Sequence, residues 1–301
     1  MEVTILKGYT FAVLSGVCAG VTVAVGKLVS AGVTSLSYVF FLSLMSVFIS
    51  VIWIKFKKYP IEFLSKDKLL VFYGHIACSF LAIWTFWEGT RLMNAGVASF
   101  SVRIELIFVL IISWIVFRER MTKFDLIGAC LIFLGASLMG AKVTSFNEGG
   151  LSNSFFSSKG GLLMLASGAS FAGAEAFANR LAGSIHSSSL VLWRSLALSG
   201  LYAIAMGFSQ DVSVPTLVDG LVIALAAFLG PFLARIFFME ALPEIGLAKA
   251  SLLSQLEPVV TTIVAWGILG ELISPLDSVG GGLVLAGCLA LNLNLSLKQE
   301  S

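Results

Sequence analysis

The stretch SLLSQLEPVVTTIVAWGILGELISPLD, Ser251–Asp277, is a long apolar run that is interrupted by Glu257-Pro258 and closed by a proline-containing turn. A second copy, SFSVRIELIFVLIISWIVFRERMTKFD, lies upstream at Ser99–Asp125. One offset, the 152 residues between Glu105 and Glu257, aligns identical residues in both copies. The aligned pairs are Glu105 with Glu257, Trp114 with Trp266, Glu119 with Glu271 and Asp125 with Asp277. The pattern indicates an internal duplication.

The duplication extends over almost the whole chain. The same offset holds without a gap from residue 7 to about residue 140, which is hard to obtain by chance. Matched pairs include Lys7-Gly8 with Lys159-Gly160, Ser15-Gly16 with Ser167-Gly168, and Gly135 with Gly287. We therefore predict two homologous halves, residues 1–141 and 160–301, joined by a Ser/Asn/Gly-rich linker at 142–159.

Composition places the chain in a membrane. Apolar residues make up 58% of the 301 residues, charged residues make up 12%, and the mean hydropathy is +0.98. A helix needs about 20 apolar residues to cross the hydrocarbon core, and backbone groups in lipid must be satisfied internally. We predict an all-α membrane protein with ten transmembrane helices. They are approximately Tyr9–Val29, Thr34–Ile54, Leu69–Glu88, Met93–Phe117, Phe124–Ala141, Gly160–Leu181, Ser187–Phe208, Asp219–Glu240, Gly246–Gly270 and Leu276–Leu297.

Five spans in each half require the second half to be inverted relative to the first. Basic residues crowd the connections after the second and fourth spans, whereas the repeat-related connections, 207–220 and 270–275, contain none. The basic residues are Lys55, Lys57, Lys58, Lys66, Lys68, Arg118, Arg120 and Lys123. Positive charge marks the cytoplasmic side, so we predict a multi-pass membrane protein with both termini in the cytoplasm. Inverted five-helix repeats are a known architecture of secondary transporters, in which the substrate site lies between the repeats near the midplane of the bilayer.

Other classes of protein lack support in the sequence. The net charge of +2 reflects the basic connections and does not indicate nucleic-acid binding. The four cysteines lie in predicted spans without disulfide or zinc spacing, and we expect neither a metal nor a cofactor. No catalytic or phosphate-binding motif is visible, and no soluble segment is long enough for an ATPase. Transport would therefore be secondary or facilitative.

The duplicated pattern resembles the drug/metabolite transporter superfamily, specifically its ten-helix EamA-like carriers. The resemblance rests on Glu257-Pro258-Val259, Gly270-Glu271, and Gly280 and Gly287, and on the first-half copies at Glu105, Glu119, Gly128 and Gly135. It implies a bacterial-type inner-membrane carrier with a central cavity lined by helices of both halves. Members move amino acids, nucleosides, cofactors or other small metabolites, often outward.

Charged residues inside the predicted spans are the candidates for substrate binding or coupling. A charge at the centre of a span costs about 3 kcal/mol on insertion scales, so it normally faces a partner or a wet cavity. With a serine one helical turn from Glu257, the candidates are Arg103, Glu105, Glu175, Arg194, Arg235, Ser254 and Glu257. Interior salt bridges that fix helix registry are the alternative interpretation. Ser254 and Thr261 should share the face of Glu257.

Repeat symmetry divides these candidates into two groups. Glu105 and Glu257 occupy equivalent positions and are candidates for the shared architecture. The other charged residues align with uncharged residues in the opposite half, so they are freer to form a substrate-specific site. The aligned pairs are Arg103 with Gln255, Arg194 with Leu42, Arg235 with Ile83, and Glu175 with Val23. Trp84 and Trp87 are possible cavity aromatics, with interfacial anchoring as the alternative for Trp87. Glu271, at the end of a span, is expected to make a helix-end or loop contact.

We therefore predict a secondary transporter that exports a small polar metabolite by alternating access, with amino acids or their derivatives favoured. Its expected partners are a small-molecule substrate and the lipid bilayer. A facilitative channel and a membrane-embedded enzyme are the alternatives.

Overall fold

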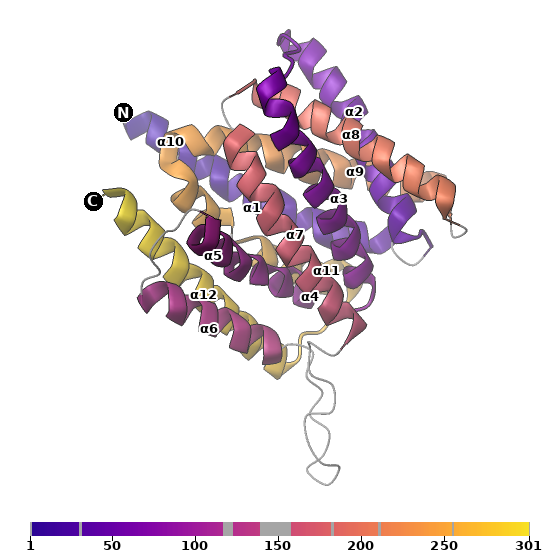
Figure 1. The fold of residues 1–301 in the computed structure, drawn as a ribbon. Helices are drawn as coiled ribbons and strands as arrows, with labels where there is room; N and C mark the ends of the chain where they lie inside the picture. Colours follow the sequence, from indigo (N-terminus) through magenta and orange to yellow (C-terminus); the bar gives the residue numbers. More distant parts are fainter. Residues whose placement is uncertain are drawn as a thin grey trace.

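The computed structural model describes residues 2–29, 32–116, 123–138, 158–181, 184–209, 212–254 and 256–300 (Figure 1). Most of the expected linker, residues 142–157, lies outside this part. The described elements are α1 (Glu2–Val29), α2 (Ser35–Lys57), η1 (Lys66–Lys68), α3 (Leu69–Arg91), α4 (Ala95–Ser101), η2 (Val102–Ile104), α5 (Glu105–Val116), α6 (Lys123–Leu138), α7 (Lys159–Leu181), α8 (Ser187–Phe208), α9 (Leu217–Ala227), η4 (Phe228–Ala234), α10 (Arg235–Ser254), α11 (Leu256–Leu269) and α12 (Pro275–Glu300).

The prediction of an all-helical membrane protein is confirmed. Seven helices are long and apolar enough to cross a membrane, and three shorter apolar helices complete the ten predicted spans. Large hydrophobic side chains cover the outer surface, and Phe208, Leu217 and Leu70 are each more than 80% exposed. This surface suits lipid, because lipid tails solvate such side chains at no cost. The start of α1 and the end of α12 lie on the same side of the molecule (Figure 1).

Two predicted spans are irregular. The fourth is broken by a 3-10 turn, η2, between α4 and α5, and the eighth contains a π-helical segment, η4, around Pro231. Pro231 has no backbone N–H and its ring clashes with the preceding turn, which accounts for the departure from α geometry. Helix α10 runs on through Ala241–Ile245, where the sequence predicted a connection between the eighth and ninth spans.

The two halves pack through reciprocal contacts. The Ser15 hydroxyl on α1 donates to the carbonyl of Ala234, 2.9 Å away, and the repeat-related Ser167 hydroxyl on α7 donates to the carbonyl of Ala82 at 3.0 Å. Each half therefore inserts its first helix against the third span of the other half. The same hydrogen bond formed twice in this way is what a two-fold relation between the halves requires.

Glycines make the last helices of the two halves fit together. A Cβ on Gly135 of α6 would lie 2.5 Å from the carbonyl oxygen of Gly280 on α12. A Cβ on the repeat-related Gly287 would lie 2.6 Å from the carbonyl oxygen of Gly128. The helices α6 and α12 therefore approach at backbone distance along a self-complementary glycine face, and they lie side by side in Figure 1.

The first helix of the chain also relies on small residues. A Cβ at Gly16 would lie 3.3 Å from the Ser254 carbonyl oxygen, and one at Gly20 would lie 2.6 Å from the Glu257 carbonyl oxygen. α1 therefore runs parallel to the segment formed by the end of α10 and the start of α11, since Gly16 meets Ser254 and Gly20 meets Glu257. Ser15 and Thr22, by contrast, meet Ala234 and Gly230 in the opposite order. α1 therefore lies between two spans of the second half that run in opposite directions.

The connection between α2 and α3 is tied to the second half. Glu62 accepts a hydrogen bond from the backbone N–H of His186 at 2.6 Å, just before α8 begins. The indole N–H of Trp193 donates to the Glu62 carbonyl at 2.8 Å. Within the spans, the hydroxyls of Ser46 on α2 and Ser195 on α8 are 2.9 Å apart. These contacts join α2 and α8 along their length.

Candidate functional site

A cavity of about 270 Å³ lies between the two halves. Its walls come from α1, α2, α3, η2 and α5 of the first half and from α7, α8, η4, α10 and α11 of the second. Many lining residues are repeat-related pairs, such as Glu105 with Glu257 and Phe86 with Phe238. The cavity therefore lies at the interface between the two halves. Carriers with inverted repeats bind their substrate at this interface.

All seven charged and polar candidates line this cavity. They are Arg103, Glu105, Glu175, Arg194, Arg235, Ser254 and Glu257. Trp87 also lines it, whereas Trp84 is not one of the lining residues and is 39% exposed. Residues far apart in the sequence thus meet in one place. Their roles in substrate binding or coupling remain a proposal.

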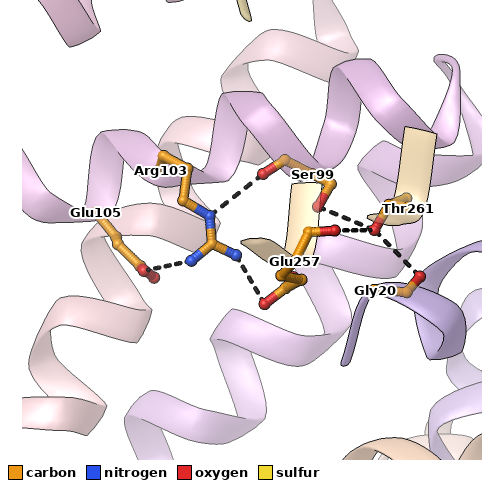
Figure 2. Close-up of polar contacts among 6 residues, drawn as sticks. All are labelled: Gly20, Ser99, Arg103, Glu105, Glu257 and Thr261. Atoms are coloured by element: carbon orange, nitrogen blue, oxygen red, sulfur yellow. Dashed lines mark hydrogen bonds and ion pairs between the residues drawn. The ribbon is translucent and has the colours of Figure 1, made fainter. Parts of the chain in front are cut away.

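Arg103 is held by two carboxylates, as Figure 2 shows. One guanidinium nitrogen lies 2.9 Å from Glu257 Oε2, and the other lies 3.4 Å from Glu105 Oε1. The Arg103 Nε donates to the Ser99 carbonyl at 3.4 Å. Residues two apart do not face each other on an α-helix, so the 3-10 turn at η2 explains how Arg103 and Glu105 pair. Arg103 thus forms interior ion pairs with Glu105 and Glu257, and it also lines the cavity.

Thr261 lies behind this network and not on the cavity wall. It is completely buried, and its hydroxyl lies 3.1 Å from the carbonyl oxygen of Gly20 and 2.9 Å from that of Glu257 (Figure 2). The hydroxyl of Ser99 is 3.3 Å away. Thr261 lies one helical turn after Glu257, as expected, but the close approach of α1 at Gly20 covers it. Thr261 instead links α1, α4 and α11.

Two other arginines reach the cavity without a carboxylate partner. Arg194 on α8 is 9% exposed and Arg235 begins α10. Within the described part of the chain, neither has an acidic oxygen within 4.0 Å, and the Nε of Arg194 has no hydrogen-bond partner. The two guanidinium groups also repel each other electrostatically. The salt-bridge interpretation does not account for them.

Glu175 and three aromatic side chains complete the wall. Glu175 on α7 lines the cavity yet is exposed, and it interacts electrostatically with Glu105. Phe86, Phe171 and Phe238 come from α3, α7 and α10. Sequence reasoning did not select these phenylalanines, because apolar side chains in a span predict lipid or core contact equally well. The repeat relation between Phe86 and Phe238 was the one available signal.

A second polar cluster, which sequence reasoning also missed, lies next to the lining residue Trp87 at the C-terminal end of α1. Trp87 packs against Gly26 near the end of α1. The next residue, Lys27, forms an ion pair with Glu271 and donates to the carbonyl of Met93. Glu271 also accepts a hydrogen bond from the backbone N–H of Ala95 at 2.7 Å. The predicted helix-end contact of Glu271 is confirmed, and its partner is the cation on α1.

Inverted five-helix halves around a central polar cavity define a membrane transporter by architecture. The comparisons with known proteins agree with that class. A family model, the EamA-like transporter family, matches residues 6–141 and again residues 158–293. The chain belongs to this family, within the drug/metabolite transporter superfamily.

A solved structure described as "Crystal structure of protein" matches with a TM-score of 0.64 and 16% sequence identity over 100% of both chains. At this identity the likeness concerns the fold alone. A search of curated proteins found no match. Family membership makes the protein a transporter and not an enzyme. Within the described residues, no group of three His, Cys, Asp or Glu side chains could hold a metal ion.

Proposed function

We propose that the protein is a secondary transporter that exports a small polar metabolite by alternating access, with amino acids or their derivatives favoured. The observation that supports this most directly is the central cavity with arginines and glutamates on facing walls. Its volume of about 270 Å³ is near the lower end of the roughly 300–1,000 Å³ typical of ligand pockets, so a small solute is favoured. Groups of both signs suit a zwitterion.

The Lys27 cluster, defined as Lys27, Met93, Ala95 and Glu271, bears on the side of the membrane to which the cavity opens. It joins α1, α4 and the connection before α12 at the C-terminal end of α1, and we propose that it closes that end of the cavity. The basic connections indicate that the N-terminal end of α1 is cytoplasmic. On that basis the closed end faces away from the cytoplasm, and this conformation would accept substrate from inside.

Exchange in proteoliposomes tests the proposal. Purified protein is reconstituted with unlabelled amino acids inside, and the entry of each labelled amino acid is measured. A carrier shows saturable entry that is accelerated by internal substrate, whereas a channel shows no such acceleration. A thermal-shift screen of metabolites in detergent chooses the substrates, because ligand binding raises apparent stability by mass action. Absence of exchange for every compound that raises the melting temperature would refute the proposal.

A further inference from the structure

Three repeat-related pairs of lining residues differ in charge between the two halves, although the fold around them is symmetric. Val23, Leu42 and Ile83 of the first half line it, and their repeat-related partners Glu175, Arg194 and Arg235 line it from the second half. Each apolar residue thus has a charged counterpart in the same cavity. A symmetric site would present the same chemistry twice, but at these three positions the cavity has an apolar wall, formed by Val23, Leu42 and Ile83, and a charged wall, formed by Glu175, Arg194 and Arg235.

Arg194 is the least compensated group on the charged wall. It is more than nine-tenths buried, it lines the cavity, and its Nε has no partner within the described part of the chain. A buried, unpaired donor costs free energy that a bound acceptor recovers. Arg235 adds a second positive charge nearby, which raises that cost. The third arginine, Arg103, is already neutralised by Glu257 at 2.9 Å and Glu105 at 3.4 Å.

We propose that Arg194 and Arg235 form a subsite for the carboxylate of the substrate, while the apolar remainder of the substrate packs on the wall of Val23, Leu42 and Ile83. This rests on the proposed function and narrows its substrate class to small carboxylates with an apolar side chain. Guanidinium groups bind carboxylates with strong, directional hydrogen bonds. The substrate would thereby bind in one orientation, with its charged end toward the second half.

Four compounds that share the isobutyl side chain of leucine test the requirement for a carboxylate. Leucine and N-acetylleucine have it, whereas leucinamide and isoamylamine lack it. We expect the first two to raise the melting temperature of the detergent-solubilised protein and the other two to have no effect. A rise with isoamylamine and none with N-acetylleucine would overturn the subsite, because the ammonium group would then be the one that is bound.

Variants that copy the first half test the two arginines. Arg194→Leu and Arg235→Ile introduce the residues found at the equivalent positions of the first half, and Arg194→Lys keeps the charge but removes the Nε donor. Each should weaken N-acetylleucine binding by about 10- to 100-fold, since a hydrogen bond to a charged group is lost. Arg91→Gln is the matched control, because Arg91 is exposed at the end of α3 and does not line the cavity.

The outcomes separate this inference from the proposed function. Unchanged N-acetylleucine affinity in folded Arg194→Lys and Arg235→Ile would overturn the subsite while leaving amino acid export intact. Loss of that affinity, in a protein that exchanges no amino acid in proteoliposomes, would support the subsite and refute the proposed substrate. If Arg194→Leu fails to fold, the lysine variant and the four-compound series still decide the question.

Discussion

Replacing Glu257 with glutamine tests the network around Arg103 most directly. The two side chains are 18% and 8% exposed and their charged atoms are 2.9 Å apart. Breaking a fully buried ion pair costs about 3–5 kcal/mol. Here the amide oxygen of glutamine still accepts a hydrogen bond, and Glu105 stays 3.4 Å from Arg103. Only the charge assistance of one hydrogen bond is lost, so we expect a destabilisation of about 1–2 kcal/mol.

The effect on transport should exceed the effect on folding. Neutralising Glu257 adds one net positive charge to the cavity wall and leaves Arg103 able to compete for substrate anions. A change of 1.4 kcal/mol in the relative stability of inward-open and outward-open states alters their ratio about tenfold. We expect Glu257→Gln to be folded, with exchange reduced about tenfold or its pH dependence altered. Counterflow in proteoliposomes at several pH values and melting in detergent measure the two effects.

Glu271→Gln is the matched comparison, since it also removes one carboxylate but lies outside the cavity lining. It weakens the contacts of Glu271 with Lys27 and with the Ala95 N–H, so the chief effect should be lower melting temperature or yield. Wild-type exchange at every pH in Glu257→Gln, together with lost exchange in well-folded Glu271→Gln, would show that the two roles are reversed.

Three further outcomes follow from the structure. Gly135→Ala should cost about 1–3 kcal/mol through overpacking of α6 on α12, whereas Gly282→Ala, with nothing within 4 Å, should be nearly neutral in thermal melting. Lys27→Met should increase labelling of the cavity by impermeant reagents from the outer face; unchanged labelling would remove the Lys27 cluster as a closure. Cysteines at the exposed Phe63 and Val214 should react from opposite faces of the membrane, and reaction from one face would refute the inverted topology.

The duplicated stretch was enough to predict the fold. Apolar length predicts spans, an odd number per half forces inversion, and one gapless offset aligns nearly every helix. Irregular geometry was less accessible. Pro231 indicated a disturbed eighth span, but the 3-10 turn that presents Arg103 has no proline or glycine in Val102–Ile104. Arg103 forms its ion pairs with Glu105 and Glu257 at that turn, and the contact with Glu257, 154 residues away in the sequence, does not follow from local propensity.

The charged part of the site was predictable because an ionisable group inside a span is costly unless it faces a partner or a wet cavity. Arg194 and Arg235 stood out further, since the first half has Leu42 and Ile83 in their places. The ion pair of Lys27 with Glu271 was missed because the two residues are far apart in the sequence and the position equivalent to Lys27 is Asn179. Comparison of the two repeats identifies residues that both halves share and residues that one half has replaced. It does not predict a contact between two positions that the repeat does not relate, such as Lys27 and Glu271.

The glycine face shared by α6 and α12 has an implication for ancestry. Because Gly135 meets Gly280 as Gly287 meets Gly128, a five-helix half already presents the surface that its copy needs, but only in the opposite orientation across the bilayer. An unfused ancestor would have had to insert both ways round to assemble. Fusion makes such dual insertion unnecessary, and the lysines between α2 and α3, which have no basic counterparts between α8 and α9, are then free to assign one orientation to each half.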